Sequence, residues 1–265
     1  MRTDVLKQKA HYERIHAAYA AHYYDAESMS FRQEFVYDVV FEGLDLNGKD
    51  VADLAAGSGY NSLWVTNRFP EARPCGFDIS EKACAAYRDL LGAQAHVFDL
   101  TSGADCGRSF DVAMVFGGLH HCVSDLPATF RTIAHLVRPG GLLLMYEPNS
   151  RYILEGLRRL WYRFDATFEG NATEGALDHD ALSAMAAPYF LSIDCRHMGG
   201  PAYFLIYNSM VFRIPQKSKR FLAPVLLPLE RAYNRLPGRF MSAYFIARWR
   251  RSDSPVAGET SALSS

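Results

Sequence analysis

Apolar positions recur along the chain in two different periods. In the first 45 residues they repeat every three or four positions, as at Phe31, Phe35 and Val39, which predicts helices. From residue 50 onward, short apolar runs alternate with helical stretches. The runs predict strands at residues 50–54, 74–78, 95–99, 110–116 and 142–147, with helices at 60–69, 80–91 and 127–137. Five such strands alternating with helices predict a parallel, doubly wound α/β sheet.

After residue 150 this regular alternation ends. Helices are expected at residues 153–164 and 178–187, and a basic helix broken by two prolines at 217–236. Extended segments are expected at 190–196, 203–212 and 240–247. We therefore divide the chain into an N-terminal helical cap (1–45), a sheet core (46–150), a further region with the final strands (151–251) and a disordered tail (252–265).

Composition narrows the class of protein. The 265 residues are 49% hydrophobic and 22% charged, with a net charge of −1, which is typical of a folded protein and excludes a chain built as a whole around a polyanion. No apolar run of 18 residues and no signal-peptide pattern at the N-terminus is present, so we expect a cytoplasmic protein. Five dispersed cysteines without a C-x-x-C pair predict free thiols and no metal site.

Charge is concentrated in one part of the chain. Residues 213–251 hold ten basic side chains and a single acid, Glu230, so this segment carries +9 and the remainder −10. The basic residues surround an apolar run at 221–229. This pattern indicates either peripheral contact with an anionic membrane or lipid, or an amphipathic helix that packs on the domain and pairs with its acids.

The candidate chemistry lies at the carboxyl ends of the first three strands, where a doubly wound sheet binds its ligand. Asp53 is followed by a turn that contains Gly57 and Gly59, and glycines there let the backbone approach a ligand closely. Asp78 ends the second strand and can accept from both hydroxyls of a ribose. Asp99 ends the third strand and can accept from an exocyclic amine.

A dinucleotide is the first ligand to consider for this turn. Its fingerprint G-x-G-x-x-G/A fails here, because the run from Gly57 reads Gly-Ser-Gly-Tyr-Asn-Ser. Asp53 is also poorly placed beside a pyrophosphate, whereas a carboxylate suits a cationic amine. A nucleoside without phosphate and with a positive end, such as S-adenosylmethionine, fits better.

These motifs resemble those of the class I S-adenosylmethionine-dependent methyltransferases over roughly residues 49–147. That family's D-x-G-x-G-x-G run corresponds to residues 53–59, with alanine at the first glycine, and the turn at 138–142 resembles its entry into strand five. The resemblance implies S-adenosylmethionine as cofactor and a Rossmann-like seven-stranded methyltransferase sheet with N-terminal helices and an inserted helical, apolar lid before the last strand. The residues that it implies for cofactor binding are Asp53, Ala55, Gly57, Gly59, Asp78, Ile79, Asp99, Leu100 and Phe116.

Each candidate also has a plain structural interpretation. The glycines can serve only the turn, Asp78 can cap the following helix, although Ser80 already suits that role, and Asp99 can be an ordinary loop residue. Tyr12, Tyr19 and Tyr23 share a helix face that either packs on the core or, in the resembled family, covers the cofactor. We include Tyr19 and Tyr23 among the cofactor-binding candidates on the second interpretation. Arg32, at the start of the next helix, can meet a carboxylate, but it is expected at the surface.

The catalytic candidates are His120, His121 and Glu147. The two histidines are the chain's only adjacent pair and follow the fourth strand at the mouth of the expected site. Histidine titrates near neutral pH, so either can remove a proton from a hydroxyl or amine; alternatively the pair packs on the cofactor. Glu147 ends the fifth strand and is expected to face the same crevice, where it either orients the acceptor or is a solvated strand end.

The region after residue 148 is rich in aromatic side chains, which predicts a small, largely apolar acceptor such as a natural-product or lipid-like intermediate, with O-methylation slightly favoured over N-methylation. One alternative is a nucleic-acid methyltransferase. No Asp/Asn-Pro-Pro-Tyr/Phe run follows the fourth strand and no appended RNA-binding module is visible, so no nucleic-acid partner is expected. The other alternative is a member of the fold that binds the cofactor without transferring methyl.

Overall fold

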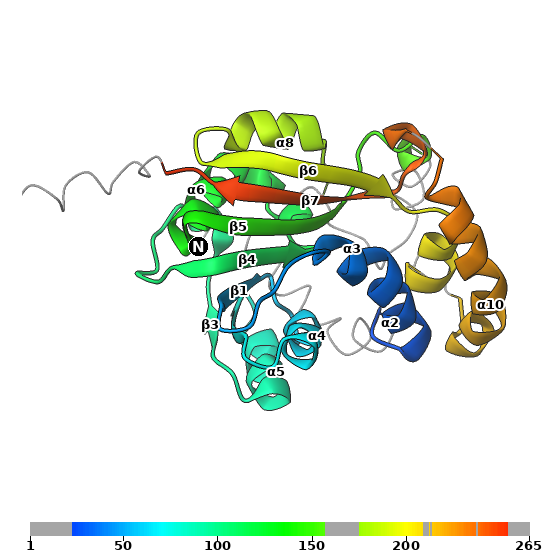
Figure 1. Cartoon of the computed structure of the whole chain (residues 1–265), viewed down its shortest axis with the longest axis horizontal. Helices are drawn as coiled ribbons and strands as arrows, with labels where there is room; N and C mark the ends of the chain where they lie inside the picture. Colours follow the sequence, from blue (N-terminus) through cyan, green and yellow to red (C-terminus); the bar gives the residue numbers. More distant parts are fainter. Residues whose placement is uncertain (1–22, 157–174, 209–211, 213, 237, 254–265) are drawn as a thin grey trace, which may run out of the picture.

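The structure is a computed structural model that describes residues 23–156, 175–208, 212, 214–236 and 238–253. Within these residues seven strands form one sheet in the order β3-β2-β1-β4-β5-β7-β6 (Figure 1). Strands β1 to β5 are parallel, and β7 runs antiparallel between β5 and β6. The strands are β1 (Asp50–Leu54), β2 (Arg73–Asp78), β3 (Ala95–Val97), β4 (Phe110–Phe116), β5 (Val137–Pro148), β6 (Phe190–Met198) and β7 (Tyr244–Arg251). The predicted seven-stranded, doubly wound sheet is confirmed.

Helices cover both faces of this sheet. They are α2 (Ala26–Arg32), α3 (Asp38–Val40), α4 (Tyr60–Arg68), α5 (Glu81–Leu91), α6 (Leu126–Leu136), α8 (His179–Ala186) and α10 (Gln216–Tyr233). Single turns add π-helical η1 (Gln33–Tyr37) and η7 (Tyr203–Tyr207), and 3₁₀ turns at Leu100–Ser102, Leu119–His121, Val123–Asp125 and Arg239–Met241.

The continuous apolar runs of the central strands follow from burial on both faces. Along β4, Val112 and Met114 pack into the cluster formed with α2 and η7, whereas Ala113 and Val115 pack into the cluster formed with α6 and α8. Strands β5 and β7 alternate between the same two clusters. Because apolar residues occupy the buried positions on both faces of β4, a shift in its pairing would exchange the two packed clusters, so the register is fixed.

Three predicted elements differ in the structure. Strand β5 begins at Val137, earlier than predicted, because Val137 pairs with Phe110 of β4. Further along β5, Gly141 lies too close to the Asp111 carbonyl for any side chain. Residues 203–207 are helical, where an extended segment was expected. The final strand β7 begins at Tyr244, after a 3₁₀ turn, instead of at residue 240.

Helix α10 is continuous, although the sequence predicted a break at its prolines. It runs through Pro224 and Pro228, which stand four residues apart, over 18 residues. Most of the helix expected at 153–164 lies outside the described residues, as do Tyr12, Tyr19 and most of the expected tail. Among the residues that the structure describes, no helix is long and apolar enough to cross a membrane.

Helix α10 lies beside α2, next to the end of the sheet toward which β4 and β5 run (Figure 1). Buried charged side chains fix it against the rest of the domain. The Lys219 ammonium is fully buried and donates to Asp25 Oδ2 at 2.5 Å and to Ser28 Oγ at 2.8 Å. The Glu230 carboxylate, also fully buried, accepts from the backbone N–H groups of Gly200 and Ala202 at 2.7 and 2.9 Å. Glu230 thereby satisfies the start of the helical turn that contains η7.

Candidate functional site

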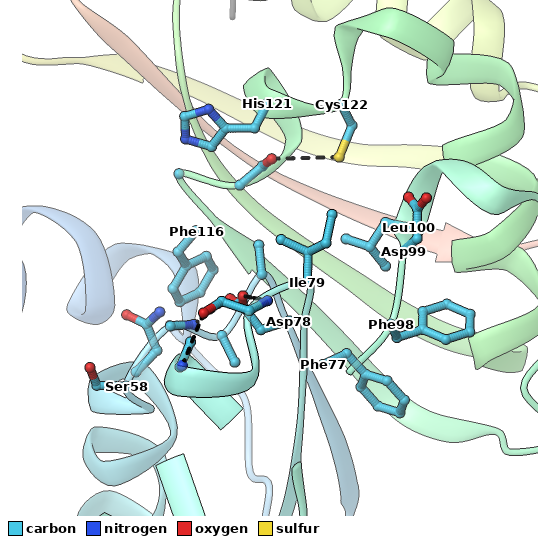
Figure 2. Close-up of a pocket in the computed structure, with 18 of the residues that line it drawn as sticks. Ser58, Phe77, Asp78, Ile79, Phe98, Asp99, Leu100, Phe116, His121 and Cys122 are labelled. Carbon is cyan, nitrogen blue, oxygen red and sulfur yellow. Dashed lines mark hydrogen bonds between the residues drawn. The ribbon is translucent and has the colours of Figure 1, made fainter. Parts of the chain in front are cut away.

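A cavity lies at the carboxyl ends of β1, β2 and β4, beside the point where the strand order reverses (Figure 2). This is where a doubly wound sheet binds its ligand. In this view Phe77 and Phe98 lie on one side of the cavity, and Phe116 and Ser58 on the other. Eight residues singled out from the sequence line it: Ala55, Gly57, Asp78, Ile79, Asp99, Leu100, Phe116 and His121.

The loop after β1 is shaped by left-handed backbone positions. Gly57 has φ +54°, and a side chain there would meet no atom within 4 Å, so the loop presents bare backbone to the cavity. Gly59 has φ +88° and a different role. A Cβ at this position would lie 2.6 Å from the Tyr87 ring, so Gly59 permits close packing of α5 and lies outside the cavity lining.

The alanine that replaces the family's first glycine is accommodated by a neighbouring strand. Ala55 has φ +53° and is the one non-glycine residue with positive φ in the described part of the chain. Its Cβ occupies the space beside Gly118, where an added Cβ would approach it to 2.5 Å. The side chain at 55 is therefore tolerated because the loop after β4 has none at 118.

Asp78 joins the two loops that border the cavity. Its Oδ2 accepts from the Gly57 N–H at 2.9 Å and its Oδ1 from the Ser80 N–H at 2.8 Å. Ser80 itself caps α5, since its Oγ accepts from the Ala83 N–H. The residue that caps α5 is therefore Ser80 and not Asp78. Asp99 Oδ1 accepts from the Thr101 N–H at 2.9 Å and starts the 3₁₀ turn after β3.

Asp53 is fully buried next to the glycine loop. Its Oδ2 accepts from Ser62 Oγ at 2.7 Å, while Oδ1 has no hydrogen-bond partner among the described residues. Burial raises the pKa of the Asp53 carboxyl to about 7, and the nearby Asp78 charge acts in the same direction, opposed by the Ser62 hydrogen bond. A buried acceptor atom without a partner is costly unless a ligand satisfies it.

Arg32 is buried, contrary to the expected surface position. Its guanidinium donates from Nη1 to Asn61 Oδ1 at 2.7 Å and from Nε to Tyr207 Oη at 3.0 Å. The guanidinium also lies over the rings of Tyr24 and Tyr207 at 4.9 and 5.0 Å from their centroids. Asn61 and Tyr24 both line the cavity. Arg32 therefore places a positive charge directly behind the cavity wall.

Glu147 was expected to face the crevice, but its side chain does not line the cavity. It is fully buried, and its Oε1 accepts from the N–H groups of Gly118 and Leu119 at 3.0 and 2.7 Å. Its Oε2 lies 2.8 Å from His120 Nδ1. Burial raises the pKa of the Glu147 carboxyl to about 7, and these backbone N–H groups oppose the rise. Glu147 thus shapes the loop after β4 and orients one imidazole.

The adjacent histidines have different surroundings. His121 lines the cavity, whereas His120 is held by Glu147 and does not line it. Their ring centroids are 3.8 Å apart. Tyr23 also lies away from the cavity, since its Oη donates to Asn208 Oδ1 at 2.8 Å; its neighbour Tyr24 lines the wall instead and stacks on Tyr60.

Several lining residues carried no motif of their own. Asn61 lies in the first turn of α4, directly after the glycine loop. Thr101 and Cys122 lie a few residues after predicted strand ends. For these three residues, the only sequence signal was that they lie close to the motifs. Tyr24 had none, because its position depends on how α2 packs. The lining residues that were not among the site candidates are Tyr24, Ala56, Ser58, Asn61, Phe77, Ser80, Ala83, Phe98, Thr101, Gly117, Gly118 and Cys122.

These features fit S-adenosylmethionine. The open backbone at Gly57 leaves room for a ligand, and Asp78 and Asp99 are acceptors that line the cavity. Asp53 lies behind the glycine loop and does not line the cavity, although its Oδ1 lacks a hydrogen-bond partner. Across the described residues, no group of three or more His, Cys, Asp or Glu side chains is arranged to hold a metal ion. The strand order and this site define a class I S-adenosylmethionine-dependent methyltransferase domain, with S-adenosylmethionine as its cofactor.

Comparison with known proteins gives the same class. Residues 51–141 match the family model described as "Methyltransferase domain". The chain is 26% identical over 152 residues to the malonyl-[acyl-carrier protein] O-methyltransferase of Hahella chejuensis (strain KCTC 2396), an alignment that covers 56% of this chain and 52% of the relative. The chain thus spans about half the length of the curated relative it matches. The resemblance noted in the sequence is confirmed.

Solved structures share the fold at low sequence identity. One is the N-methyltransferase NodS of Bradyrhizobium japonicum WM9 in complex with S-adenosyl-L-homocysteine, with a TM-score of 0.52 and 9% identity, covering 85% of this chain and 88% of NodS. Another is the [4+2]-cyclase SpnF, with a TM-score of 0.55 and 17% identity, covering 81% and 80%. At these identities the likeness concerns the fold alone.

Proposed function

We propose that this protein transfers a methyl group from S-adenosylmethionine to a hydroxyl of a small, largely apolar metabolite. The observation that carries the proposal is the pair formed by His120 and Glu147 beside the cofactor cavity, with 2.8 Å between His120 Nδ1 and Glu147 Oε2. An acceptor hydroxyl needs a base to remove its proton, and an imidazole that is oriented by a carboxylate is a suitable base.

The cavity residues divide among the parts of the cofactor. Asp78 and Ile79 are proposed to hold the ribose, and Asp99 and Leu100 the adenine, beside Phe77 and Phe98, which also line the cavity. The Ala55–Gly57 backbone and Asp53 are proposed to hold the methionine end. Asn61, whose Oδ1 accepts from Arg32, supplies a donor for the methionine carboxylate from its amide nitrogen, and Arg32 adds a positive charge behind the cavity wall. When bound, S-adenosylmethionine supplies a methyl group on a positively charged sulfur, which an acceptor atom attacks in line.

The proposed mechanism assigns three separate roles to the residues beside β4. His120 Nε2 takes the proton of the acceptor hydroxyl while Nδ1–H donates to Glu147, which keeps the ring in one tautomer and stabilises it when charged. His121 contacts the cofactor. The protein otherwise contributes alignment of the two reacting groups and exclusion of water.

The apolar character of the acceptor is inferred from the aromatic side chains that pack between η7 and β5. Tyr203, Tyr207 and Tyr146 form a buried aromatic cluster there, with ring centroids of Tyr146 and Tyr207 6.2 Å apart. The matched relative is an O-methyltransferase that acts on malonyl-[acyl-carrier protein]. The relative's activity supports an oxygen acceptor, and the aromatic cluster supports an apolar part of the acceptor molecule.

The proposal is tested by methyl transfer from S-adenosylmethionine to a panel of hydroxyl and amine acceptors. His120→Ala is expected to reduce turnover by about 10²–10⁴ while S-adenosylhomocysteine affinity stays near the wild-type value. His120→Ala should also remove an ionisation near neutral pH from the rate profile. His96→Ala, a histidine on β3 outside the cavity, is the matched control and should retain full turnover.

Two outcomes would contradict this assignment. Full turnover in both His120→Ala and His121→Ala would leave alignment alone as the mechanism, and transfer only to amines would replace the oxygen acceptor by nitrogen. Binding of S-adenosylhomocysteine without transfer to any acceptor would favour a non-methylating member of the fold.

A further inference from the structure

Helix α10 exposes an apolar stripe to solvent. Phe221, Val225 and Leu229 stand four residues apart on one side of the helix, with exposed fractions of 82%, 62% and 49%. Side chains at this spacing form a continuous strip along a helix. Nearby, Leu236 and Phe240 are also more than half exposed. We refer to the surface of α10 that carries Phe221, Val225 and Leu229 as the outer face of α10.

This face is not part of the core. The opposite side of the same helix is the one that packs, through the buried residues Lys219, Leu226 and Glu230. Because Lys219 and Glu230 are fixed by hydrogen bonds to α2 and to the turn before η7, the helix cannot rotate to bury the stripe without breaking them. The outer face is held outward by the fold.

The charge around the stripe has one sign. Lys217, Arg220 and Arg231 are exposed on α10, and Arg235 is exposed just after its end, whereas the only acid of α10, Glu230, is buried on the other side. Arg231 pairs with Glu34 of η1, which leaves Lys217, Arg220 and Arg235 as the basic flank of the stripe. An apolar strip bordered by basic residues and free of acids is the pattern of a helix that lies in the plane of an anionic membrane surface.

We propose that the outer face of α10 docks on anionic lipid bilayers, with Phe221, Val225 and Leu229 entering the interface and Lys217, Arg220 and Arg235 contacting lipid phosphates. No described helix is long and apolar enough to span a bilayer, so the contact is peripheral. The occupant is inferred from charge complementarity, since anionic headgroups match the basic flank and acyl chains match the stripe. The inference does not depend on the methyl acceptor.

The face lies where membrane contact would matter for the site. Helix α10 borders α2 and η7, and η7 supplies Tyr207, which binds Arg32 behind the cavity wall. In Figure 1, α10 forms the outer edge of the molecule on the side toward which β4 and β5 run. Docking through the outer face therefore brings the carboxyl-end side of the sheet toward the bilayer.

The test is flotation of the full chain with two kinds of vesicle, phosphatidylcholine alone and phosphatidylcholine with phosphatidylglycerol. Wild-type protein is expected to float only with the anionic vesicles and to be released by high salt. The double variant Phe221→Ser/Val225→Ser and the double variant Lys217→Glu/Arg220→Glu should each weaken binding by roughly tenfold or more.

Matched controls separate this face from general stickiness or charge. Leu191→Ser/Ile193→Ser removes two exposed apolar residues from β6, and Lys49→Glu/Lys82→Glu reverses two exposed charges elsewhere. Both should bind like wild type. Circular dichroism and S-adenosylhomocysteine affinity check that every variant is folded and report separately on the methyltransferase site.

Three results would overturn the proposal. One is no flotation with either vesicle, and the second is equal loss of binding in the control variants. The third is a wild-type dimer, measured by light scattering, that becomes monomeric in Phe221→Ser/Val225→Ser, because the stripe would then be an interface between two copies of this chain.

Discussion

Asp53 combines complete burial, one acceptor oxygen without a partner and a pKa raised to about 7. A protonated carboxylic acid cannot accept strongly from a cation, whereas the ionised form can. The raised pKa therefore means that the free protein holds this site partly neutral near pH 7. An ammonium group at Oδ1 would favour ionisation and release the proton.

This coupling gives the first prediction. If Asp53 receives the ammonium of the cofactor, affinity for S-adenosylhomocysteine should rise by about tenfold from pH 6 to pH 8 and level off above, since only the ionised form binds well. Isothermal titration across this pH range measures it. Asp53→Asn should flatten the dependence, whereas Glu147→Gln, whose carboxyl also has a pKa near 7 but lies on another loop, should keep it.

A pH-independent affinity in the wild type, or an unchanged slope in Asp53→Asn, would place the ammonium elsewhere. The stability of the free protein depends on pH in the opposite direction. A carboxyl whose folded pKa is raised holds its proton more tightly in the folded state, so Asp53 contributes progressively less stability as pH rises from about 4 to about 7.

At the residue scale, sequence could identify groups that follow a strand end but not groups brought in by packing. Asp78 and Gly57 stood in a recognisable run, and both line the cavity. Arg32 carried no such signal, because its burial depends on Tyr207, which is 175 positions away in the chain. For Glu147 the position was predicted and the direction was not, since the three backbone N–H groups that attract its carboxylate belong to another loop.

Among the elements, α10 shows how differently two charged contacts on one helix can contribute. The Lys219 ammonium and its partner Asp25 are almost completely withdrawn from water, whereas Arg231 and Glu34 meet at the surface. The two pairs tie the same helix to neighbouring parts of the N-terminal segment, so a comparison between them holds the architecture constant.

We predict that Lys219→Met destabilises the protein by about 3–5 kcal/mol, because the Asp25 charge remains buried without its partner. Arg231→Met, on the exposed side of the same helix, should change the free energy of unfolding by less than about 1 kcal/mol. Urea denaturation followed by circular dichroism measures both. Similar values for the two variants would mean that the buried pair does not anchor α10.

The same scale shows why some elements were predictable and others not. Strands β1 and β4 have the predicted bounds, because apolar runs buried on both faces are unambiguous when turn residues flank them. Residues 203–207 have an equally apolar sequence but are helical, since Glu230 caps the turn that leads into them from 30 residues further on. A partner so distant cannot be found by local periodicity.

For the molecule as a whole, the cavity joins two parts that are distant in sequence. Its floor is the glycine loop and strand ends of the sheet, and Tyr24 contributes from the segment before α2. Arg32 of α2 is joined to Asn61 of α4 across the same boundary. A ligand in the cavity therefore touches both parts and should hold them together.

Binding of S-adenosylhomocysteine is accordingly expected to slow amide hydrogen exchange in two separate segments, residues 23–37 and 55–61. At 100 times Kd the ligand should also add about 2.7 kcal/mol to the stability of the folded state. Exchange along β6, at the far edge of the sheet, serves as the internal reference and should stay unchanged. Protection confined to residues 55–61 would show that the N-terminal segment takes no part in binding.

The contact between Ala55 and Gly118 also has an evolutionary consequence. A side chain at either position excludes one at the other, because the two Cβ atoms would be 2.5 Å apart. From the present sequence, a side chain at Gly118 requires one of the two loops to shift unless Ala55 has first become glycine. Substitutions in these two loops, which follow different strands, are therefore coupled, since a side chain at one of the two positions disfavours a side chain at the other.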